Sequence, residues 1–432
     1  MAALLSEIVD RRLDEVVRQR MELEPVVVLQ GPRAVGKSTL LRTLATARGR
    51  EVIDLDDLAT RDAVAADPAL FMRGEAPVLI DEFQHVPELL DAIKAELNRD
   101  GAPGRYVLTG STRYATLPAA AQALTGRAHR VDVLPLSQGE IAGVREDFVE
   151  VLLSDPSSLV DRNPAATARE EYVSRVVAGG FPMALRRARA ADRARWFDDY
   201  IELIIERDVL ELTRVHQRRQ LPLLLRQLAG QTAQVLNVAN AARAIGMDKS
   251  TAESYTKLLE TVFLVHRLPA WGTTLGRRVG AAPKVHVVDS GLAARLLSLT
   301  EGKLGAATAP ALTEFGHLLE TFVVGEVSKQ LDWLDAPVVR GHWRTHDGDE
   351  VDLVLEREDG AIAALEVKAA SRVSTRELRS LLKLRNKLQG QFLGGVVLYT
   401  GARAYTQEGL QIVPISRLWR AAPPGVYGKE VA

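Results

Sequence analysis

The feature that most constrains this chain is a glycine-bounded loop, Gly31 to Thr39, set between two apolar segments. The apolar run 25–29 before it is typical of a buried strand, and the run 40–44 after it continues as a helix. Glycines let successive backbone N–H groups turn toward phosphates, and the helix N-terminus adds partial positive charge. The order strand, loop and helix therefore predicts a Walker A nucleotide-binding loop.

The spacing in this loop predicts the residues that contact ATP or ADP. They are Gly31, Pro32, Arg33, Ala34, Val35, Gly36, Lys37, Ser38 and Thr39. Lys37 can reach the β- and γ-phosphates, and the Ser38 hydroxyl can ligate Mg²⁺. The alternative is a glycine-rich turn with a surface lysine, which the complete strand–loop–helix context disfavours.

A second apolar strand, 77–80, ends in the two carboxylates Asp81 and Glu82. This is the form of a Walker B strand. Asp81 is expected to hold the Mg²⁺ shell, and Glu82 to polarise the water that attacks ATP. An acidic pair at a strand end is common by itself, but about forty residues after a Walker A loop it supports ATP hydrolysis.

Composition limits the classes of protein that remain. The chain has 432 residues, which suggests two to four domains, and its net charge of −1 gives no overall attraction to nucleic acid or anionic membranes. It has no cysteine, which excludes disulfides and thiolate metal sites. No signal-peptide pattern is seen at the start, and no apolar run approaches the roughly 20 residues of a membrane helix. We therefore expect a cytoplasmic protein without membrane contacts.

The first part of the chain alternates between helical and strand patterns, which predicts a parallel α/β sheet. Residues 1–24 have apolar positions at near-helical spacing and are expected to form an amphipathic helix. The expected strands lie at 26–29, 51–55, 78–80, 105–108 and 129–133.

The middle of the chain contains a helix-turn-helix candidate within a mostly helical region. Residues 237–245 form the first helix, and Ser250 with Glu253 forms a capping box that opens the second. The second helix exposes side chains that could face DNA: Lys249, Thr251, Ser254 and Lys257. DNA contact and a winged-helix fold used only for packing or dimerisation are equally open.

Beyond an expected linker at 302–310, the C-terminal part has a nuclease-like pattern. Period-two alternation places Glu366 and Lys368 on one face of a strand. Pairing across the Asp359-Gly360 turn brings Asp352 beside them, and Glu320 on the preceding helix can supply another carboxylate. We expect Glu320, Asp352 and Glu366 to bind Mg²⁺ or Mn²⁺, and Lys368 to assist phosphodiester cleavage. The alternatives are a hairpin with solvated charges, or neutralisation of the carboxylates by Lys368 without metal.

Taken together, these motifs resemble a prokaryotic family of AAA+-type P-loop ATPases. Its C-terminal domain of unknown function is related to the PD-(D/E)XK nuclease fold. The matching segments are 31–40, 81–84, 108–111, 126–127, 135–140, 179–182, 206–208, 288–292, 316–320, 349–352 and 366–368. The resemblance implies four parts: an AAA+-like parallel-sheet domain with an N-terminal helix (1–140), a helical region (141–230), a winged helix (231–300) and a restriction-endonuclease-like α/β domain (311–432).

The resemblance also implies roles that the local pattern does not give. Thr109 or Ser111 would be a sensor residue at the end of the fourth strand. Arg127 would be an arginine finger or γ-phosphate sensor, in cis or from a neighbouring subunit of a homo-oligomer.

Three functions remain open on sequence alone. In the first, ATP hydrolysis drives or gates a nuclease that acts on DNA. In the second, a nucleotide switch binds DNA or a protein, and the nuclease fold is catalytically silent. In the third, the chain is a signalling ATPase of the STAND type with no nucleic-acid partner.

Overall fold

The computed structural model describes residue 5 and residues 8–113, 124–160, 167–209, 218–274, 278, 281–306 and 308–420. Its N-terminal part is a five-stranded parallel sheet in the order β2-β3-β4-β1-β5. The strands are β1 (Val26–Gln30), β2 (Val52–Asp54), β3 (Val78–Asp81), β4 (Tyr106–Gly110) and β5 (Ala128–Asp132). All five predicted strands are confirmed, with ends that differ by one or two residues.

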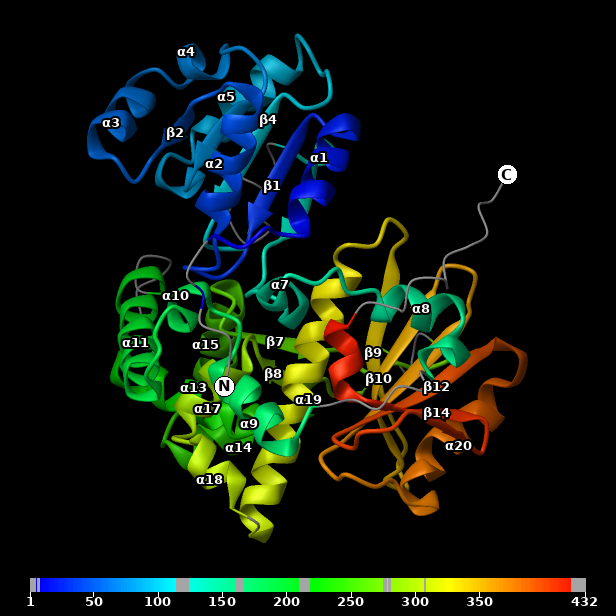
Figure 1. Ribbon diagram of the computed structural model, residues 1–432. Helices are drawn as coiled ribbons and strands as arrows, with labels where there is room; N and C mark the ends of the chain where they lie inside the picture. The colour runs from blue at the N-terminus through cyan, green and yellow to red at the C-terminus, as the bar shows by residue number, and fades with distance from the viewer. Residues whose placement is uncertain are drawn as a thin grey trace, which may run out of the picture.

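Helices cover both faces of this sheet, which is why β1, β3 and β4 are buried along their whole length. One face carries α1 (Leu13–Leu23) and α2 (Lys37–Arg48). The other carries α3 (Leu58–Ala66), α4 (Pro68–Met72) and α5 (Leu89–Leu97). Figure 1 shows this domain at one end of the molecule.

The expected N-terminal helix over 1–24 is too long, because α1 begins only at Leu13. The preceding residues are held to another part of the chain. The Arg12 backbone N–H donates to Glu140 Oε1 at 2.9 Å, and the Arg11 side chain bonds the same carboxylate at 2.9 Å. These contacts fix the segment before α1 outside the helix. No described helix is long and apolar enough to cross a bilayer.

The middle of the chain is built mainly from helices. They are α7 (Gln138–Ala142), α8 (Phe148–Ser154), α9 (Arg169–Ala178), α10 (Pro182–Leu185), α11 (Ala190–Leu203), α13 (Leu221–Ala229), α14 (Val238–Ala244), α15 (Lys249–Thr261), α17 (Ser290–Leu296) and α18 (Glu301–Gly305). A small antiparallel sheet in the order β6-β8-β7 lies among them. Its strands are β6 (Gln234–Val235), β7 (Val265–Leu268) and β8 (Lys284–Val287).

Two details of the middle region differ from expectation. The predicted capping box of Ser250 and Glu253 is wrong, because Asp248 is the N-cap of α15 and accepts from the backbone N–H of Ser250 and Thr251. The helix begins two residues earlier than expected, so the first unpaired N–H groups are those of Ser250 and Thr251, and Asp248 is placed to accept from them. The predicted linker at 302–310 is also wrong in part, since α18 ends at Gly305 and the next helix begins at Ala309.

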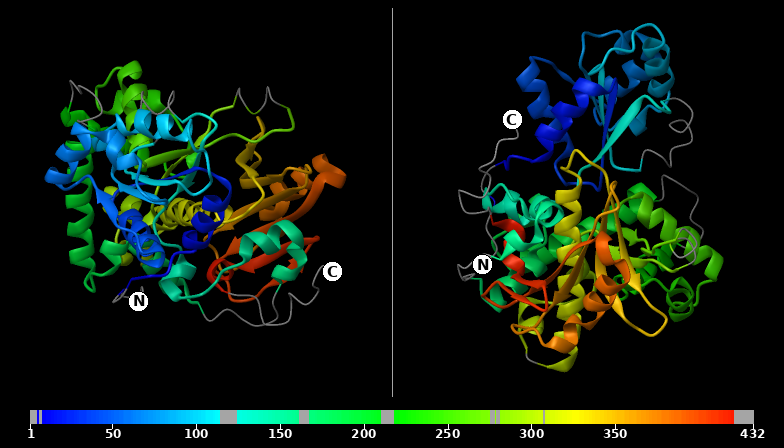
Figure 2. Two further views of the ribbon diagram at one scale, coloured as in Figure 1. Left: turned by 90° about the horizontal axis from the view of Figure 1, so that it is seen from above. Right: turned by 90° about the vertical axis from the view of Figure 1, so that its right-hand side faces the viewer.

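The C-terminal part is a mixed six-stranded sheet in the order β13-β14-β12-β11-β10-β9. Its strands are β9 (Val338–Arg344), β10 (Glu350–Arg357), β11 (Ile362–Lys368), β12 (Phe392–Tyr399), β13 (Tyr405–Gln407) and β14 (Leu410–Pro414). The long helix α19 (Ala309–Leu331) contacts both this sheet and the middle region, while α20 (Arg379–Leu388) packs against β10, β11 and β12. Figure 2 shows the middle region and the C-terminal sheet side by side, with the N-terminal domain above them.

Two short motifs in the middle region, residues 179–182 and 288–292, pack α9 against α17. The Gly180 backbone N–H donates to Asp289 Oδ2 at 2.7 Å, and Asp289 also caps α17 through the Leu292 N–H. A Cβ on Gly291 would lie 2.8 Å from the carbonyl oxygen of Ala178. The glycines thus allow two backbones to approach closely around a buried carboxylate.

This packing predicts an unequal effect of two glycine substitutions. Gly179 and Gly246 have nearly the same left-handed φ, +67° and +65°. A Cβ on Gly179 would lie 2.1 Å from Asp289 Oδ1, whereas a Cβ on Gly246 meets nothing within 4 Å. We expect Gly246→Ala to cost about 1 kcal/mol of stability from backbone strain alone. Gly179→Ala should cost roughly 1–3 kcal/mol more, because its ψ of −157° gives a backbone conformation essentially restricted to glycine and because the added Cβ overpacks against Asp289. Denaturation of both variants checks this, and equal losses would contradict it.

Candidate functional site

The glycine-bounded loop leaves β1 at a point where only glycine fits. A Cβ on Gly31 would lie 2.2 Å from the carbonyl oxygen of Val133, the residue after β5. The Val133 N–H in turn donates to the Gln30 carbonyl at 2.7 Å. Gly36 has φ +100°, and α2 begins at the next residue. Each glycine therefore has a steric reason, and the loop feeds directly into a helix N-terminus.

The lysine of this loop lies buried inside it. Lys37 Nζ donates to the carbonyl oxygens of Gly31 at 2.9 Å and Pro32 at 2.8 Å. The loop is thus folded around a positive charge. Carbonyl oxygens are acceptors that an ammonium can exchange for phosphate oxygens without leaving the loop.

The predicted magnesium ligands are brought together at the carboxyl edge of the sheet. Asp81 ends β3 and is hydrogen-bonded by the hydroxyls of Thr109, which lies on β4, and Ser38, which lies on α2. Burial raises the pKa of Asp81, while these two hydrogen bonds oppose the rise. The arrangement supplies a carboxylate and a hydroxyl side by side, which is an oxygen donor set suited to Mg²⁺.

The neighbouring carboxylate, Glu82, is positioned by residues of β4 and of the turn after β3. Its backbone has a left-handed φ of +53°, and its N–H donates to Thr109 Oγ1 at 3.0 Å. Its side chain accepts from Gln84 Nε2, which also lies 3.2 Å from Ser111 Oγ. Both sensor candidates, Thr109 and Ser111, therefore contact the acidic pair directly or through Gln84.

Arg127 does not join this group. It precedes β5, whose first residue Ala128 pairs with Val26 at the start of β1, whereas the phosphate loop follows the other end of β1. Four residue steps separate Val26 from Gln30 at the other end of β1, and this corresponds to a distance of about 13 Å along the strand. The Arg127 guanidinium instead donates to Asn98 Oδ1 at 2.7 Å. Arg127 therefore does not contact the predicted site of its own chain in this conformation, and its role, in cis or in a neighbouring subunit, stays a prediction.

Sequence reasoning missed Arg11, which braces the loop from outside. Its guanidinium donates to the Val35 carbonyl at 2.8 Å, the Leu134 carbonyl at 2.8 Å and Glu140 Oε1 at 2.9 Å. Glu140 belongs to a capping box with Ser137 at the start of α7. The contacts with Leu134 and Glu140 span more than 120 positions and that with Val35 spans 24, so no local pattern could have revealed them.

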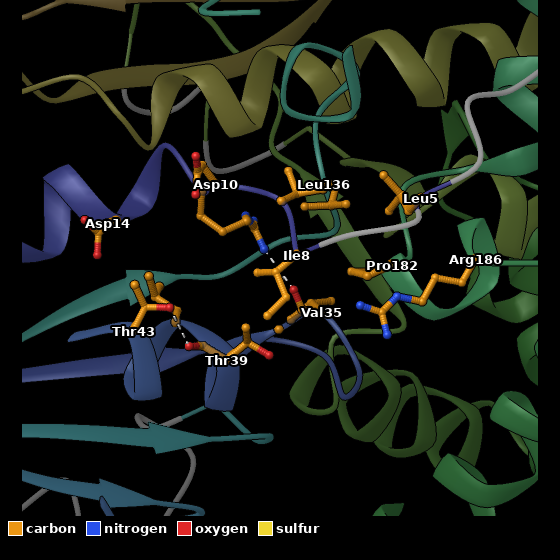
Figure 3. Close-up of a pocket in the computed structure, with 14 residues that line it drawn as sticks. Leu5, Ile8, Asp10, Asp14, Val35, Thr39, Thr43, Leu136, Pro182 and Arg186 are labelled. Atoms are coloured by element: carbon orange, nitrogen blue, oxygen red, sulfur yellow. Dashed lines mark hydrogen bonds between the residues drawn. The ribbon is translucent and has the colours of Figure 1, made fainter. Parts of the chain in front are cut away.

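A cavity of about 210 Å³ adjoins the loop on the side of the N-terminal segment. Figure 3 shows side chains from four separate stretches of the chain that converge on it. They are Leu5, Ile8, Asp10 and Asp14 before and within α1, Val35, Thr39 and Thr43 in the loop and α2, and Leu136, Pro182 and Arg186 from the middle of the chain. The lining combines aliphatic side chains with a few polar groups, as small-molecule sites commonly do.

The C-terminal sheet brings the predicted acidic residues together. Asp352 on β10 accepts from the Val367 N–H at 2.9 Å, which places it beside Glu366 on the paired strand β11. Lys368 Nζ lies 2.6 Å from Glu366 Oε1. Burial and the nearby Asp352 charge raise the pKa of Glu366 to about 8.

A lysine that the sequence did not suggest lies among these carboxylates. Lys284 Nζ on β8 is 2.6 Å from Glu320 Oε1, 3.0 Å from Asp352 Oδ1 and 2.5 Å from Glu350 Oε1. Within the described part of the chain, no three acidic or histidine side chains are arranged to hold a metal ion. The predicted metal set of Glu320, Asp352 and Glu366 is assembled in space, but in this conformation an ammonium neutralises it.

The second helix of the helix-turn-helix candidate exposes most, but not all, of the side chains that were expected to face DNA. Lys249, Ser254 and Lys257 are exposed on α15, as expected, while Thr251 is half-buried. Lys249 lies 3.6 Å from Glu253 on the same helix. Part of the segment between β7 and β8 (275–277 and 279–280) lies outside the described residues, as does 210–217.

Comparison with known protein families divides the chain into three. Residues 23–142 match an AAA domain. Residues 169–303 and 315–418 match two domains of unknown function, DUF8612 and DUF4143. The first match covers the sheet, the phosphate loop and the acidic pair.

Similar proteins extend over most of the chain. Uncharacterized proteins of Mycobacterium tuberculosis and Mycobacterium bovis are each 29% identical over 386 residues, which is 88% of this chain and 79% of theirs. Among solved structures, a Walker-type ATPase of Pyrococcus abyssi is 17% identical, with 68% of this chain and 97% of that chain covered and a TM-score of 0.41.

The contacts of Arg11 generate a prediction about stability. Its side chain is 10% exposed and that of Glu140 is 1% exposed, so Arg11→Met leaves a buried carboxylate without this partner. We expect a loss of about 2–4 kcal/mol. Arg48→Met, at an exposed position on α2, is the control and should cost less than about 0.5 kcal/mol. Thermal denaturation compares the two, and an unchanged midpoint for Arg11→Met would contradict the bracing role.

Proposed function

We propose that this chain, whose residues 23–142 form an AAA-type P-loop ATPase domain, binds ATP with Mg²⁺ and hydrolyses it. One observation carries the proposal. Ser38, Asp81 and Glu82 meet at one edge of the sheet, with Lys37 at the centre of the adjoining loop.

Each of these residues has a distinct role in the proposal. Lys37 exchanges the Gly31 and Pro32 carbonyls for the β- and γ-phosphate oxygens. Ser38 and Asp81 would hold the Mg²⁺ ion, which neutralises charge that develops on the phosphates. The residues fit a hard cation because hydroxyl and carboxylate oxygens are its preferred ligands.

Glu82 is the proposed general base, and Gln84 controls its position. In the structure the Gln84 amide donates a hydrogen bond to the Glu82 carboxylate. Gln84 also contacts Ser111, and Thr109 bridges Asp81 and the Glu82 backbone. We propose that γ-phosphate contacts made by Thr109 or Ser111 release Glu82 to accept a proton from the attacking water.

The cavity in Figure 3 is the proposed site for the nucleotide base. It adjoins Val35, Gly36 and Thr39, so a base placed there would be continuous with phosphates in the loop. Aliphatic side chains such as Leu5 and Ile8 suit the faces of a purine ring. Arg186 is exposed at the rim, where it would add positive charge beside the triphosphate.

For the C-terminal domain we propose a nuclease-like module controlled by the nucleotide state. The juxtaposition of Asp352, Glu366 and Lys368 on paired strands supports metal-dependent phosphodiester chemistry on DNA. The second candidate is a silent nuclease fold that binds DNA or a protein. The ammonium of Lys284 inside the carboxylate cluster favours it for the conformation described here.

Two substitutions test the ATPase proposal. Lys37→Ala removes the phosphate-binding ammonium and should abolish measurable ATP binding. Glu82→Gln keeps Lys37 and the Mg²⁺ ligands but cannot accept a proton, so we expect near-native ATP affinity and a loss of turnover of about 10²-fold or more. Calorimetry measures binding and phosphate release measures turnover. Wild-type turnover by Glu82→Gln would show that Glu82 is not the base.

The position of Arg127 predicts a dependence on neighbouring subunits. If Arg127 completes the site of another copy, Arg127→Ala should lower turnover at least tenfold with little change in ATP affinity. Mixing Arg127→Ala with Glu82→Gln protein should then restore part of the activity, because some interfaces combine an intact arginine with an intact glutamate. No restoration, together with a monomer in light scattering at all nucleotide concentrations, would refute the role.

A further inference from the structure

A single buried ammonium connects the middle region to the acidic cluster of the C-terminal domain. The Lys284 side chain is 1% exposed and lies within ion-pair distance of Glu320, Glu350 and Asp352. Its ammonium lies 2.6 Å from Glu320 Oε1 and 3.0 Å from Asp352 Oδ1, so it takes the place that a metal cation would occupy between these carboxylates.

The cluster holds more carboxyl groups than cationic groups. It contains four carboxyl groups, those of Glu320, Glu350, Asp352 and Glu366. Its cationic groups are the ammonium groups of Lys284 and Lys368 and the guanidinium of Arg344, whose Nε lies 3.7 Å from Glu350 Oε2. Glu366 is 7% exposed, and its Oε2 atom has no hydrogen-bond partner among the described residues. A buried carboxylate oxygen left without a partner is costly unless a further ligand satisfies it.

Lys284 does not belong to the sheet whose carboxylates it neutralises. It begins β8, the central strand of the small β6-β8-β7 sheet, and pairs there with Leu268. The segment after β7 joins this small sheet to the C-terminal sheet. The Trp271 N–H donates to the His342 carbonyl at 2.6 Å, and the His342 N–H donates to the Pro269 carbonyl at 2.9 Å. The ammonium is thus delivered by a strand of a different sheet from the one that carries Asp352 and Glu366.

The same small sheet is linked to the nucleotide domain. Arg113, three residues beyond β4, donates through Nε to the Glu260 carbonyl at 2.8 Å, and its backbone N–H donates to the Thr261 carbonyl at 3.0 Å. Its guanidinium lies 4.4 Å from the Phe263 ring centroid, just before β7. A shift at the end of β4, which carries Thr109 and is followed by Ser111, would therefore act on the end of α15 and on Phe263, which lies two residues before β7.

We propose that Lys284 is a built-in cation that closes the C-terminal carboxylate cluster to divalent metal ions, and that the cluster opens when β8 withdraws this lysine. The inference rests on the proposed metal-dependent role of the C-terminal domain and adds its regulation. A metal ion and the Lys284 ammonium compete for the same oxygens of Asp352 and Glu320, so only one can be bound.

Mn²⁺ binding to the nucleotide-free full chain, followed by electron paramagnetic resonance, tests this competition. The test variant is Lys284→Gln. The matched control is Lys329→Gln, because Lys329 is also buried and ion-paired, 2.6 Å from Glu326, but lies outside the cluster. Each protein is measured with and without Asp352→Asn, so that only binding at the cluster is counted.

We expect Lys284→Gln to bind Mn²⁺ at least tenfold more tightly than wild type, with the gain lost in the Asp352→Asn background. Lys329→Gln and Lys284→Arg should behave like wild type, because both keep a cation at the cluster. Wild-type binding as tight as that of Lys284→Gln, or a folded Lys284→Gln that binds no Mn²⁺, would overturn the inference.

A second variant covers the case in which Lys284→Gln fails to fold. The double variant Lys284→Gln/Glu350→Gln removes one charge of each sign, so the net charge of the cluster is unchanged. This double variant should also bind Mn²⁺ through Asp352. If it folds and does not bind Mn²⁺, the inference is overturned. ATP hydrolysis and DNA cleavage are measured on the same proteins. Mn²⁺ binding without cleavage would refute the nuclease role and leave the closure by Lys284 standing.

Discussion

Parallel strand pairing at the N-terminal sheet is the constraint on which the proposed chemistry depends. Because β1, β3 and β4 run in the same direction, the phosphate loop, the acidic pair and the sensor residues all emerge at one edge. The buried hydroxyl of Thr109 then ties Asp81 to the Glu82 backbone. No single loop supplies the site. It exists because the sheet holds three strand ends in register.

The second organising feature is a pair of buried basic side chains, each of which reaches from one part of the chain into another. Arg11 reaches from the N-terminal segment to the phosphate loop, and Lys284 reaches from the middle region into the C-terminal carboxylates. Both side chains are largely buried, so moving either one exposes an uncompensated charge. Such contacts make the relative position of the domains matter to both sites, which is what a nucleotide-controlled module requires.

The sequence predicted those features whose signals are local. Strand periodicity located the five parallel strands, and it correctly placed Glu366 and Lys368 on one face with Asp352 on the neighbouring strand. It missed Arg11 and Lys284 because their partners lie far along the chain, where side-chain spacing carries no information. It also left out Glu350, although Glu350 lies two positions before Asp352 on β10 and the same alternation places both on one face. The cap of α15 was misplaced because aspartate and serine both cap helices, and only the backbone shows which one does.

Hydrogen exchange with and without a non-hydrolysable ATP analogue and Mg²⁺ tests whether the glycine-bounded loop and the adjoining cavity bind one nucleotide. We expect slower exchange in three separate segments, 8–14, 31–39 and 182–186, because residues of all three adjoin the proposed nucleotide site. Lys37→Ala should show none of these changes. Analogue binding measured by calorimetry without protection of 31–39, or with protection confined to the C-terminal sheet, would show that the nucleotide does not bind there.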